Sequence, residues 1–324
     1  MKKLLFTGGG GAASEALYSL LGEHYEVHFA DADIDARPYS LPANRWHQIP
    51  FASDPVFVKA LFRLCHDIEA DILIPSVDEE LLPVARARKD AGCDILLPPS
   101  EFIEVHLDKL TSNSLLKKHG LPAPQTKLLS GYQRIPFPCI VKPRYGRGSR
   151  GVAIVHSEQE LQAHLLLSRR KHDEFIIQEF LQGDEYTVMM AADRDGQLCA
   201  VVPVKVGMKK GITLRAETDH DECVIAACAS IHAAYPVPGY YNIQLIKMAA
   251  GDVKPFEINP RISTTACLGL AAGVDFIDVC FVGKKYEGRR ESGLLPFCDR
   301  LELRRSWHNE FVSNLPKNKH SSGD

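Results

Sequence analysis

The sequence lacks the features of a membrane, secreted or nucleic-acid-binding protein. Its 324 residues contain no apolar run that approaches the roughly 18 residues required for a membrane span. The apolar stretch after the charged start, in MKKLLFTGGGG, is too short for a signal peptide. The nine cysteines form no C-x-x-C pair, and most have small or apolar neighbours, as expected of reduced thiols in a core. A net charge of −3 provides no basic field that would attract a nucleic acid or a membrane surface, so we expect neither as a partner. Without a signal peptide or a membrane span, we expect a cytoplasmic protein.

The N-terminal part of the chain alternates short apolar runs with amphipathic segments. The runs that predict strands are residues 3–7, 26–30, 72–74 and 95–97. The segments that predict helices are residues 12–21, 56–68 and 79–91. Regular alternation of strands and helices produces a parallel sheet covered on both faces. This part is therefore predicted to be a Rossmann-like α/β unit.

The pattern changes near Ser100. Residues 107–119 predict a helix that ends at Gly120, where two nearby prolines act as stop signals. From Glu185 onward, predicted strands follow one another without regular helical crossovers, which is typical of an antiparallel sheet. The second half of the chain is therefore predicted to be α+β, and the polar residues 317–324 a frayed tail.

A first glycine cluster, TGGGGAA, joins the first predicted strand to the first predicted helix. Gly8, Gly10 and Ala13 fit the pattern G-x-G-x-x-A, and Asp31 and Asp33 lie about twenty residues further on, where a carboxylate meets the ribose of a dinucleotide. Any parallel α/β unit also needs small residues at this turn, simply to pack. Both interpretations stay open, but a stronger nucleotide signal downstream makes NAD(P) binding the less favoured one.

A second glycine cluster, in CIVKPRYGRGSRGVAIV, carries that stronger signal. Lys142 ends an apolar strand, and Gly146, Gly148 and Gly151 follow before the next strand. Glycines allow backbone N–H groups to turn toward an anion, and Ser149 and three arginines of the loop add further donors. A decorated hairpin turn is the alternative, but it needs fewer glycines and no buried lysine. The pattern favours a mobile flap that covers phosphates, and it is not a Walker A loop because no helix follows.

Polar side chains converge near the end of a late strand, in NIQLIKMAAGDVKPFEINPRIS. Glu257 and Asn259 are two residues apart on this strand, so both point to the same face. Gln244 is expected beside them on the neighbouring strand, and Arg261 follows on the same face. Hard cations such as Mg²⁺ take carboxylate and amide oxygens and complete their shell with phosphates. The sequence therefore predicts a metal site rather than an ordinary polar sheet face.

Three regions now occur in one order: a lysine on a helix, Lys109, then the strand lysine with its flap, then E-x-N-x-R on a strand. That order resembles the ATP-grasp superfamily, and FIIQEFLQGDEYTV fits the hinge segment of the family. The resemblance implies an ATP-grasp fold of two lobes that binds ATP and Mg²⁺ (or Mn²⁺) behind the Rossmann-like domain. The domains it implies are residues 1–104 (Rossmann-like pre-ATP-grasp domain), 105–180 (N-terminal lobe with the flap), 181–295 (C-terminal lobe with the metal site) and 296–324 (C-terminal extension and flexible tail).

The same resemblance assigns a role to each candidate residue. Phosphates are bound by Lys109, Lys142 and the flap residues Gly146, Gly148, Ser149 and Gly151. Adenine is held by Glu179, Phe180 and Leu181, and ribose by Glu185. The metal ligands are Gln244, Glu257 and Asn259. The catalytic residues are Arg261 and Lys142.

NIQ, FEINPRIS and AAGVDF look closest to the synthetase domain of the carbamoyl phosphate synthase large subunit and its single-domain relatives. Because the chain has one copy of the unit and no glutaminase domain, we expect a stand-alone carboxylate–amine ligase that forms an acyl phosphate and releases ADP. The alternatives are a bicarbonate- or carbamate-phosphorylating enzyme, a small-molecule kinase and a non-catalytic nucleotide-binding module. The small-molecule partners would be a carboxylate and an amine, and a homodimer is common for this architecture.

Two segments are candidates for substrate recognition. Lys205, Lys209, Lys210 and Arg215 belong to a basic stretch that could hold the acceptor carboxylate, although a solvated loop face explains them equally well. Residues 76–80 of the N-terminal unit are expected to contribute to the choice of acid and amine.

Overall fold

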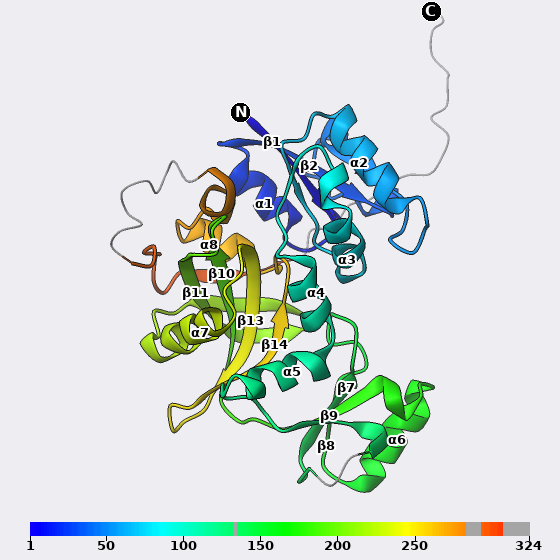
Figure 1. The fold of residues 1–324 in the computed structure, drawn as a ribbon, viewed down its shortest axis with the longest axis vertical. Helices are drawn as coiled ribbons and strands as arrows, with labels where there is room; N and C mark the ends of the chain where they lie inside the picture. Colours follow the sequence, from blue (N-terminus) through cyan, green and yellow to red (C-terminus); the bar gives the residue numbers. More distant parts are fainter. Residues whose placement is uncertain (132–134, 283–292, 307–324) are drawn as a thin grey trace, which may run out of the picture.

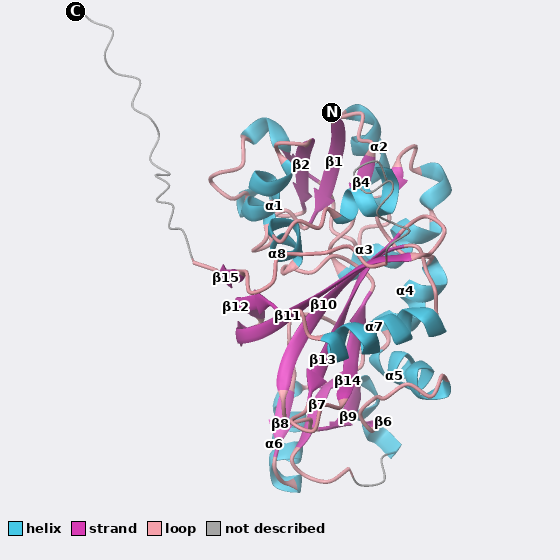
Figure 2. Ribbon diagram, turned by 90° about the vertical axis from the view of Figure 1, so that its left-hand side faces the viewer, coloured by secondary structure: helices cyan, strands magenta, loops and turns pink. Residues whose placement is uncertain are grey.

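The computed structural model describes residues 1–131, 135–282 and 293–306. The predicted tail at residues 317–324 lies outside these ranges, as does part of the predicted extension at 296–324. Figures 1 and 2 show three successive parts: a parallel sheet with its helices, a long antiparallel sheet, and a small sheet with one helix at the far end.

The N-terminal part contains the parallel sheet predicted from the sequence. Its five strands lie in the order β3-β2-β1-β4-β5, so β1 is central. The strands are β1 (Lys2–Thr7), β2 (Tyr25–Asp31), β3 (Trp46–Gln48), β4 (Ile72–Ile74) and β5 (Asp94–Ile95). The helices are α1 (Ser14–Leu21), α2 (Phe57–Asp67) and α3 (Asp78–Arg86).

Alternation along β1 explains why helices cover both faces of this sheet. Leu4 and Phe6 belong to a core cluster that includes Leu17 of α1. Leu5, which points the other way, belongs to a separate cluster that includes Leu61 of α2 and Leu81 of α3. Because β1 pairs in parallel with β2 and β4, the carboxyl ends of these three strands meet at one edge of the sheet, and this edge faces the rest of the molecule (Figure 2).

The central part is a six-stranded antiparallel sheet in the order β14-β13-β10-β11-β12-β15. Its strands are β10 (Asp184–Ala192), β11 (Leu198–Lys210), β12 (Ile212–Thr218), β13 (Gly239–Lys247), β14 (Val253–Asn259) and β15 (Glu302–Arg304). The helices of this part are α4 (Ser100–Leu107), α5 (Lys109–Lys118), α7 (Glu222–Ala234) and α8 (Ala266–Ala271), followed by a short π-helical turn, Asp278–Val282.

The two faces of the central sheet differ in what covers them. Val188 and Met190 of β10 share a core cluster with side chains from α4, α5 and α7. Met189 and Ala191, on the opposite face, share a cluster with α8 and with the N-terminal part. Further along that same face the side chains become polar, which marks where the sheet stops being covered and a cavity begins.

The smallest part is a four-stranded antiparallel sheet in the order β6-β9-β7-β8, packed against α6 through Val141, Phe175 and Leu161. Its elements are β6 (Thr126–Leu128), β7 (Cys139–Pro143), β8 (Ala153–Val155), α6 (Glu158–Ser168) and β9 (Phe175–Glu179).

The helix predicted over residues 107–119 is α5, which begins at Lys109 because Asp108 leaves the helical conformation and caps it with its side chain. The helix before it, α4, ends at Leu107 and was not predicted. The basic stretch around Lys205 is not a loop: β11 continues to Lys210 and turns at Gly211 into β12. Six of the nine cysteines are buried, as predicted. No helix in the described part of the chain is both long and apolar enough to cross a membrane.

Gly183 provides a test of how the central sheet is assembled. It precedes β10 next to the pairing of Asp184 with Lys247, and an added Cβ would overlap the carbonyl group of Lys247. Because that obstacle is backbone, we expect Gly183→Ala to lower the free energy of unfolding by about 1–3 kcal/mol in urea titrations. Gly207→Ala is the matched control on β11, since its Cβ would meet only ordinary contacts. Equal stability of the two variants would contradict the close approach at Gly183.

Candidate functional site

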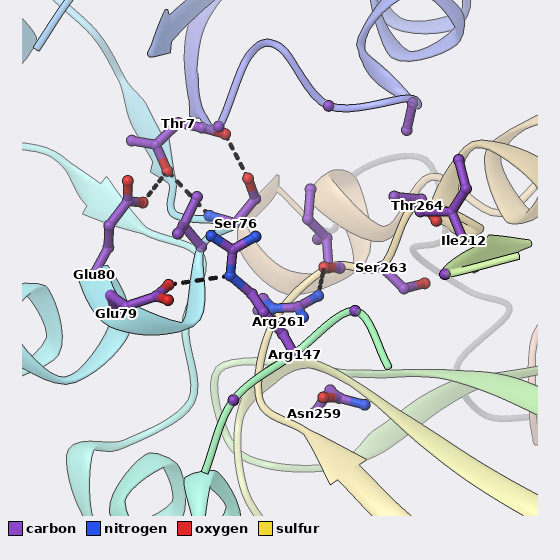
Figure 3. Close-up of a pocket in the computed structure, with 18 of the residues that line it drawn as sticks. Thr7, Ser76, Glu79, Glu80, Arg147, Ile212, Asn259, Arg261, Ser263 and Thr264 are labelled. Carbon is purple, nitrogen blue, oxygen red and sulfur yellow. Dashed lines mark hydrogen bonds and ion pairs between the residues drawn. The ribbon is translucent and has the colours of Figure 1, made fainter. Parts of the chain in front are cut away.

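A cavity of about 910 Å³ lies where the three parts of the molecule meet. Its walls come from the β1–α1 turn, the end of β2, the start of α3, the loop between β7 and β8, and the polar face of the central sheet. Figure 3 shows side chains from these segments pointing toward one another. The basic residues of the lining are Lys109, Lys142, Arg147, Arg150, Lys209 and Arg261. The acidic ones are Asp31, Asp33, Glu79, Glu80 and Glu257.

The three predicted metal ligands share one wall of this cavity. The register of β13 with β14 places Gln244 directly opposite Glu257, and Asn242 opposite Asn259. The amide nitrogen of Asn259 donates to Asn242 Oδ1 at 3.4 Å, which leaves the Asn259 amide oxygen without a partner among the described residues. One carboxylate and two amide oxygens therefore face the same space, which is a donor set that suits a hard cation. No cluster of three or more His, Cys, Asp and Glu side chains competes with it in the described ranges.

The two predicted phosphate lysines reach the same wall from the other side. Lys109 Nζ lies 3.6 Å from Glu257 Oε1 and donates to Gly146 O at 2.6 Å. Lys142 is only 4% exposed, and its Nζ lies 3.4 Å from Phe256 O. Burial lowers the pKa of Lys142 to about 8, although Glu257 opposes the shift. Both lysines therefore converge on Glu257, which forms an ion pair with Lys109 and is the carboxylate whose charge favours the protonated form of Lys142.

Asp108 fixes the position of Lys109 on α5 relative to Lys142 on β7. Its carboxylate caps α5 by accepting from Leu110 N at 3.0 Å, and so fixes the first turn that carries Lys109. It also accepts from Arg144 Nε at 2.8 Å, two residues after Lys142. Burial would raise the pKa of Asp108, but hydrogen bonds from Arg144 and Thr111 lower it to about 2. Arg144, expected to add charge to the flap, is instead used for this link.

The loop between β7 and β8 has the backbone that its glycines predict. Gly146, Gly148 and Gly151 have φ of +115°, +68° and +72°, and Ser149 also has a positive φ of 57°. Gly146, Gly148 and Ser149 line the cavity, whereas a Cβ at Gly151 would press on Pro143. The mobility of this loop stays a prediction.

Two ion pairs join the N-terminal part to the rest of the site, and the sequence gives no direct signal for either. Arg261 pairs with Asp78, and Arg147 Nε lies 3.1 Å from Glu79 Oε2 (Figure 3 shows the second pair). Asp78 and Glu79 are the first two residues of α3. The helix that follows β4 thus contacts both the predicted catalytic arginine and the flap.

The predicted adenine and ribose residues lie beside the cavity rather than in its lining. Glu179 ends β9 and pairs with Lys254 at 3.1 Å, and Phe180 and Leu181 belong to the link between the two antiparallel sheets. Glu185 accepts from Lys209 Nζ at 2.6 Å. Since Lys209 lines the cavity, Glu185 is separated from the cavity by the Lys209 side chain.

Of the four basic residues predicted for substrate binding, only Lys209 lines the cavity. Lys205 pairs with Asp184 at 2.8 Å, and Lys210 and Arg215 are exposed; none of the three lines the cavity. Lys209 does, because side chains alternate along β11 and the register shifts next to it.

The first glycine cluster serves packing in this structure. A Cβ at Gly9 would collide with Trp46 and Phe29, and one at Gly10 would collide with Ala36. Gly10 N donates to Asp31 Oδ2 at 2.9 Å, so the carboxylate proposed to meet a ribose is bonded to the turn itself. These contacts favour the packing interpretation over NAD(P) binding.

Glu80 is a functional candidate that the sequence analysis included only as part of the segment 76–80. It is 5% exposed, lines the cavity and accepts a hydrogen bond from the Thr7 hydroxyl. Ser76 N in turn donates to Thr7 Oγ1 at 3.0 Å. Burial raises the pKa of Glu80 to about 7, and neighbouring Asp31 adds to the shift although the Thr7 bond opposes it. The position of this carboxyl in the cavity depends on β1 and α3 packing together, which no local pattern shows.

The shifted pKa of Glu80 predicts a pH-dependent stability. The unfolded chain loses this proton near pH 4.5 and the folded chain only near pH 7, so the stability of the fold decreases as the pH rises between those values. We expect Glu80→Gln, which keeps an acceptor for Thr7, to match the wild type at pH 5 and to gain at most about 3 kcal/mol at pH 8. Urea unfolding at both pH values measures this. A loss of stability at pH 8 would show that the ionised carboxylate supports the fold instead.

Comparisons with known proteins agree with this geometry. Residues 107–265 match the family model of the ATP-grasp domain. The chain is 24% identical over 217 residues to the carbamoyl phosphate synthase large chain of Clostridium botulinum (strain Alaska E43 / Type E3), covering 61% of this chain and 20% of that one. It is 31% identical over 142 residues to the D-alanine–D-alanine ligase of Corynebacterium aurimucosum, covering 41% and 39%. The chain thus spans about a fifth of the large chains that it matches.

Solved structures show the same fold over most of the chain. The L-amino acid ligase from Bacillus licheniformis superposes with a TM-score of 0.66 at 17% identity, covering 86% of this chain and 72% of that one. The N5-carboxyaminoimidazole ribonucleotide synthetase from Thermotoga maritima gives a TM-score of 0.60 at 20% identity, covering 86% and 74%. Residues 107–265 of this chain therefore form an ATP-grasp domain.

Proposed function

We propose that this protein is an ATP-dependent carboxylate–amine ligase, which activates a carboxylate as an acyl phosphate and joins it to an amine. The observation that carries the proposal is the convergence of Lys109 and Lys142 on Glu257, with Gln244 beside it, in one cavity. A D-alanine–D-alanine ligase and an L-amino acid ligase among the similar proteins support this reaction class.

The donor groups fit ATP with a magnesium ion. The carboxylate of Glu257 and the amide oxygens of Gln244 and Asn259 would hold Mg²⁺ (or Mn²⁺), and the buried cation of Lys142 is a partner for phosphate oxygens. A bound ion would neutralise phosphate charge and align the phosphates. Lys109 and the flap backbone at Gly146, Gly148 and Ser149 would hold the same phosphates, with Gly151 shaping the flap.

The remaining assignments follow the family resemblance. We assign adenine to the backbone of Glu179, Phe180 and Leu181, and ribose to Glu185. The domains proposed are a Rossmann-like unit at residues 1–104, lobes at 105–180 and 181–295, and an extension at 296–324. A homodimer in the cytoplasm remains our expectation.

The reaction requires that the reacting groups be aligned and that the negative charge of the phosphates be neutralised, more than it requires a protein nucleophile. A carboxylate oxygen forms a bond to the γ-phosphorus of ATP while the bond to the bridging oxygen breaks, and ADP leaves. The amine nitrogen then forms a bond to the carbonyl carbon, the carbon–oxygen bond to phosphate breaks, and the amine loses a proton. Lys142 and Arg261 would offset the negative charge that builds up in both steps.

ADP release across a panel of carboxylates and amines tests the proposed reaction. Release that depends on a carboxylate, with formation of an amide, is the expected result. Release that depends on bicarbonate alone would favour the carbamoyl-phosphate-synthase-like alternative. A stable phosphorylated product would favour a kinase. Binding of ATP without any turnover would favour a nucleotide-binding module.

Glu257 is expected to be essential for turnover but not for folding. Glu257→Gln keeps the shape of the side chain and removes the charge that attracts both the metal and Lys109. We expect ADP release to decrease by at least about 100-fold, in line with the loss of one strong electrostatic contact in a transition state. The melting temperature measured without ligand serves as the control. Unchanged ADP release would contradict the metal assignment.

Lys142 tests the phosphate side of the same site. Lys142→Met fills the same buried space without a charge, so the fold should persist while affinity for ATP decreases about 10- to 100-fold in isothermal titration. Lys59→Met, at an exposed position on α2, is the matched control for losing one positive charge. Equal affinities for ATP in both variants would exclude Lys142 from the phosphate site.

A further inference from the structure

Arg305, which follows β15, joins three segments that are far apart in the sequence. Its Nε donates to Thr213 O at 3.0 Å and its Nη2 to Thr264 O at 2.8 Å. Its Nη1 donates to Ala12 O. Each nitrogen of the guanidinium group therefore bonds to the carbonyl oxygen of a different segment. No carboxylate in the described ranges forms an ion pair with Arg305, so its hydrogen bonds, rather than a charge pair, define what it does.

All three segments form walls of the cavity. Thr213 of β12 and Thr264 line it directly, and Ala12 lies in the β1–α1 turn, whose neighbouring residues line it. Figure 3 shows Thr264 and Ile212 at one side of the cavity. Arg305 is not itself part of the lining. It therefore lies behind the cavity wall and holds parts of that wall together.

Thr264 belongs to the segment 262–265, which connects the predicted catalytic arginine, Arg261, to α8. This segment is neither helix nor strand, and all four of its residues line the cavity. At its start, Asn242 Nδ2 from β13 donates to Arg261 O at 2.8 Å. Arg305 holds the other end, because the guanidinium group that bonds to Thr264 O also bonds to β12.

The backbone of the C-terminal segment explains why Arg305 is fixed in this place. Strand β15 pairs with β12, and Arg305 N donates to Leu214 O at 2.9 Å, which continues that pairing. Earlier in the segment, Arg300 N donates to Thr218 O at 3.0 Å. Residues 300–305 are therefore bonded to the edge of the central sheet, and the side chain of Arg305 reaches the cavity wall from this edge.

An arginine suits this position for a geometric reason. Its planar guanidinium group carries donors on three nitrogens that point in different directions. A lysine or a neutral amide has only one donor nitrogen, so neither would reach three carbonyl groups on three segments in the same way. An irregular segment also lacks the backbone partners that a helix or a strand provides. Removal of Arg305 would therefore leave Thr264 O without its guanidinium partner and loosen the wall.

We propose that Arg305 is a positioning residue for the proposed reaction. It holds the segment 262–265 against β12 and the β1–α1 turn, and so fixes the direction in which Arg261 projects into the cavity. This inference rests on the proposed ligase function and gives the C-terminal segment a part in assembling the site. Lys142 and Glu257, on β7 and β14, lie outside the segments that Arg305 joins. Arg305 therefore governs turnover rather than binding of ATP.

Arg305→Met tests this role because it keeps the apolar stem and removes all three hydrogen bonds. We expect kcat for carboxylate-dependent ADP release to decrease about 10- to 100-fold, since a small displacement of a catalytic group has an effect of this size. The affinity for ATP in isothermal titration should stay within about threefold of the wild type. Arg305→Lys restores one donor nitrogen, so it should recover part of the lost kcat. Arg304→Met is the matched control, because Arg304 lies on β15, is exposed and pairs with Glu302.

Hydrogen exchange tests whether Arg305 holds the segment, and it needs no turnover. In Arg305→Met the amides of residues 262–265 and of the β1–α1 turn should exchange about 10-fold faster than in the wild type. The amides of β10 and β13 should keep their wild-type rates, because these strands pair with each other inside the central sheet. If Arg305→Met folds poorly, Arg305→Lys answers the same question through a smaller decrease in kcat and the same local exchange.

The outcomes distinguish this inference from the proposed function. Wild-type kcat in Arg305→Met, or an affinity for ATP that decreases as much as kcat, would overturn the positioning role and leave the ligase function standing. Faster exchange throughout the chain, with no local excess at residues 262–265, would overturn it in the same way. If the wild type releases no ADP with any carboxylate, the ligase function is overturned and Arg305 loses its role in that reaction.

Discussion

The pair formed by Asp108 and Arg144 is the interaction on which the rest of the site depends. One carboxylate caps α5 and also receives the guanidinium group that follows β7. Backbone bonds reinforce the link, since Lys109 N donates to Arg144 O at 3.1 Å. The helix and strand that carry Lys109 and Lys142 therefore cannot shift independently. Both lysines reach Glu257, which lies on a third element, only because this joint fixes their relative position.

The site holds charges that the protein alone does not fully compensate. Lys142 is buried with a lowered pKa, and Glu80 is buried with a raised one. The charged form of each side chain would be more favourable in water, so the burial of each lowers the stability of the protein without ligand. Ligand groups of the opposite charge remove that cost when they bind. In the proposed function, phosphates would do so for Lys142.

The fold was largely predictable where a pattern extends over enough residues. The parallel sheet follows from strand–helix alternation, and β4 occupies the residues predicted for it. Strands β3, β6 and β15 are as short as β4 but contain polar residues, so no apolar run marks them in the sequence. They form because longer neighbouring strands pair with them. Helix α4 was missed although it is eight residues long, and Asp108 separates it from the predicted helix α5, which it caps with its side chain.

The sequence by itself determined the chemistry of the nucleotide side: a strand lysine before a glycine-rich loop, and Glu257 and Asn259 on one face of a strand. Those features are local, because spacing along a strand decides which way side chains point. Tertiary structure alone decided the substrate side. It paired Asp78 with Arg261 and Glu79 with Arg147, brought Lys209 rather than Lys205 into the cavity, and buried Glu80 against Thr7. The two ion pairs exist only once the N-terminal part and the ATP-grasp domain have packed together, and the contact of Glu80 with Thr7 only once α3 has packed against β1, because each joins residues that are far apart in the chain.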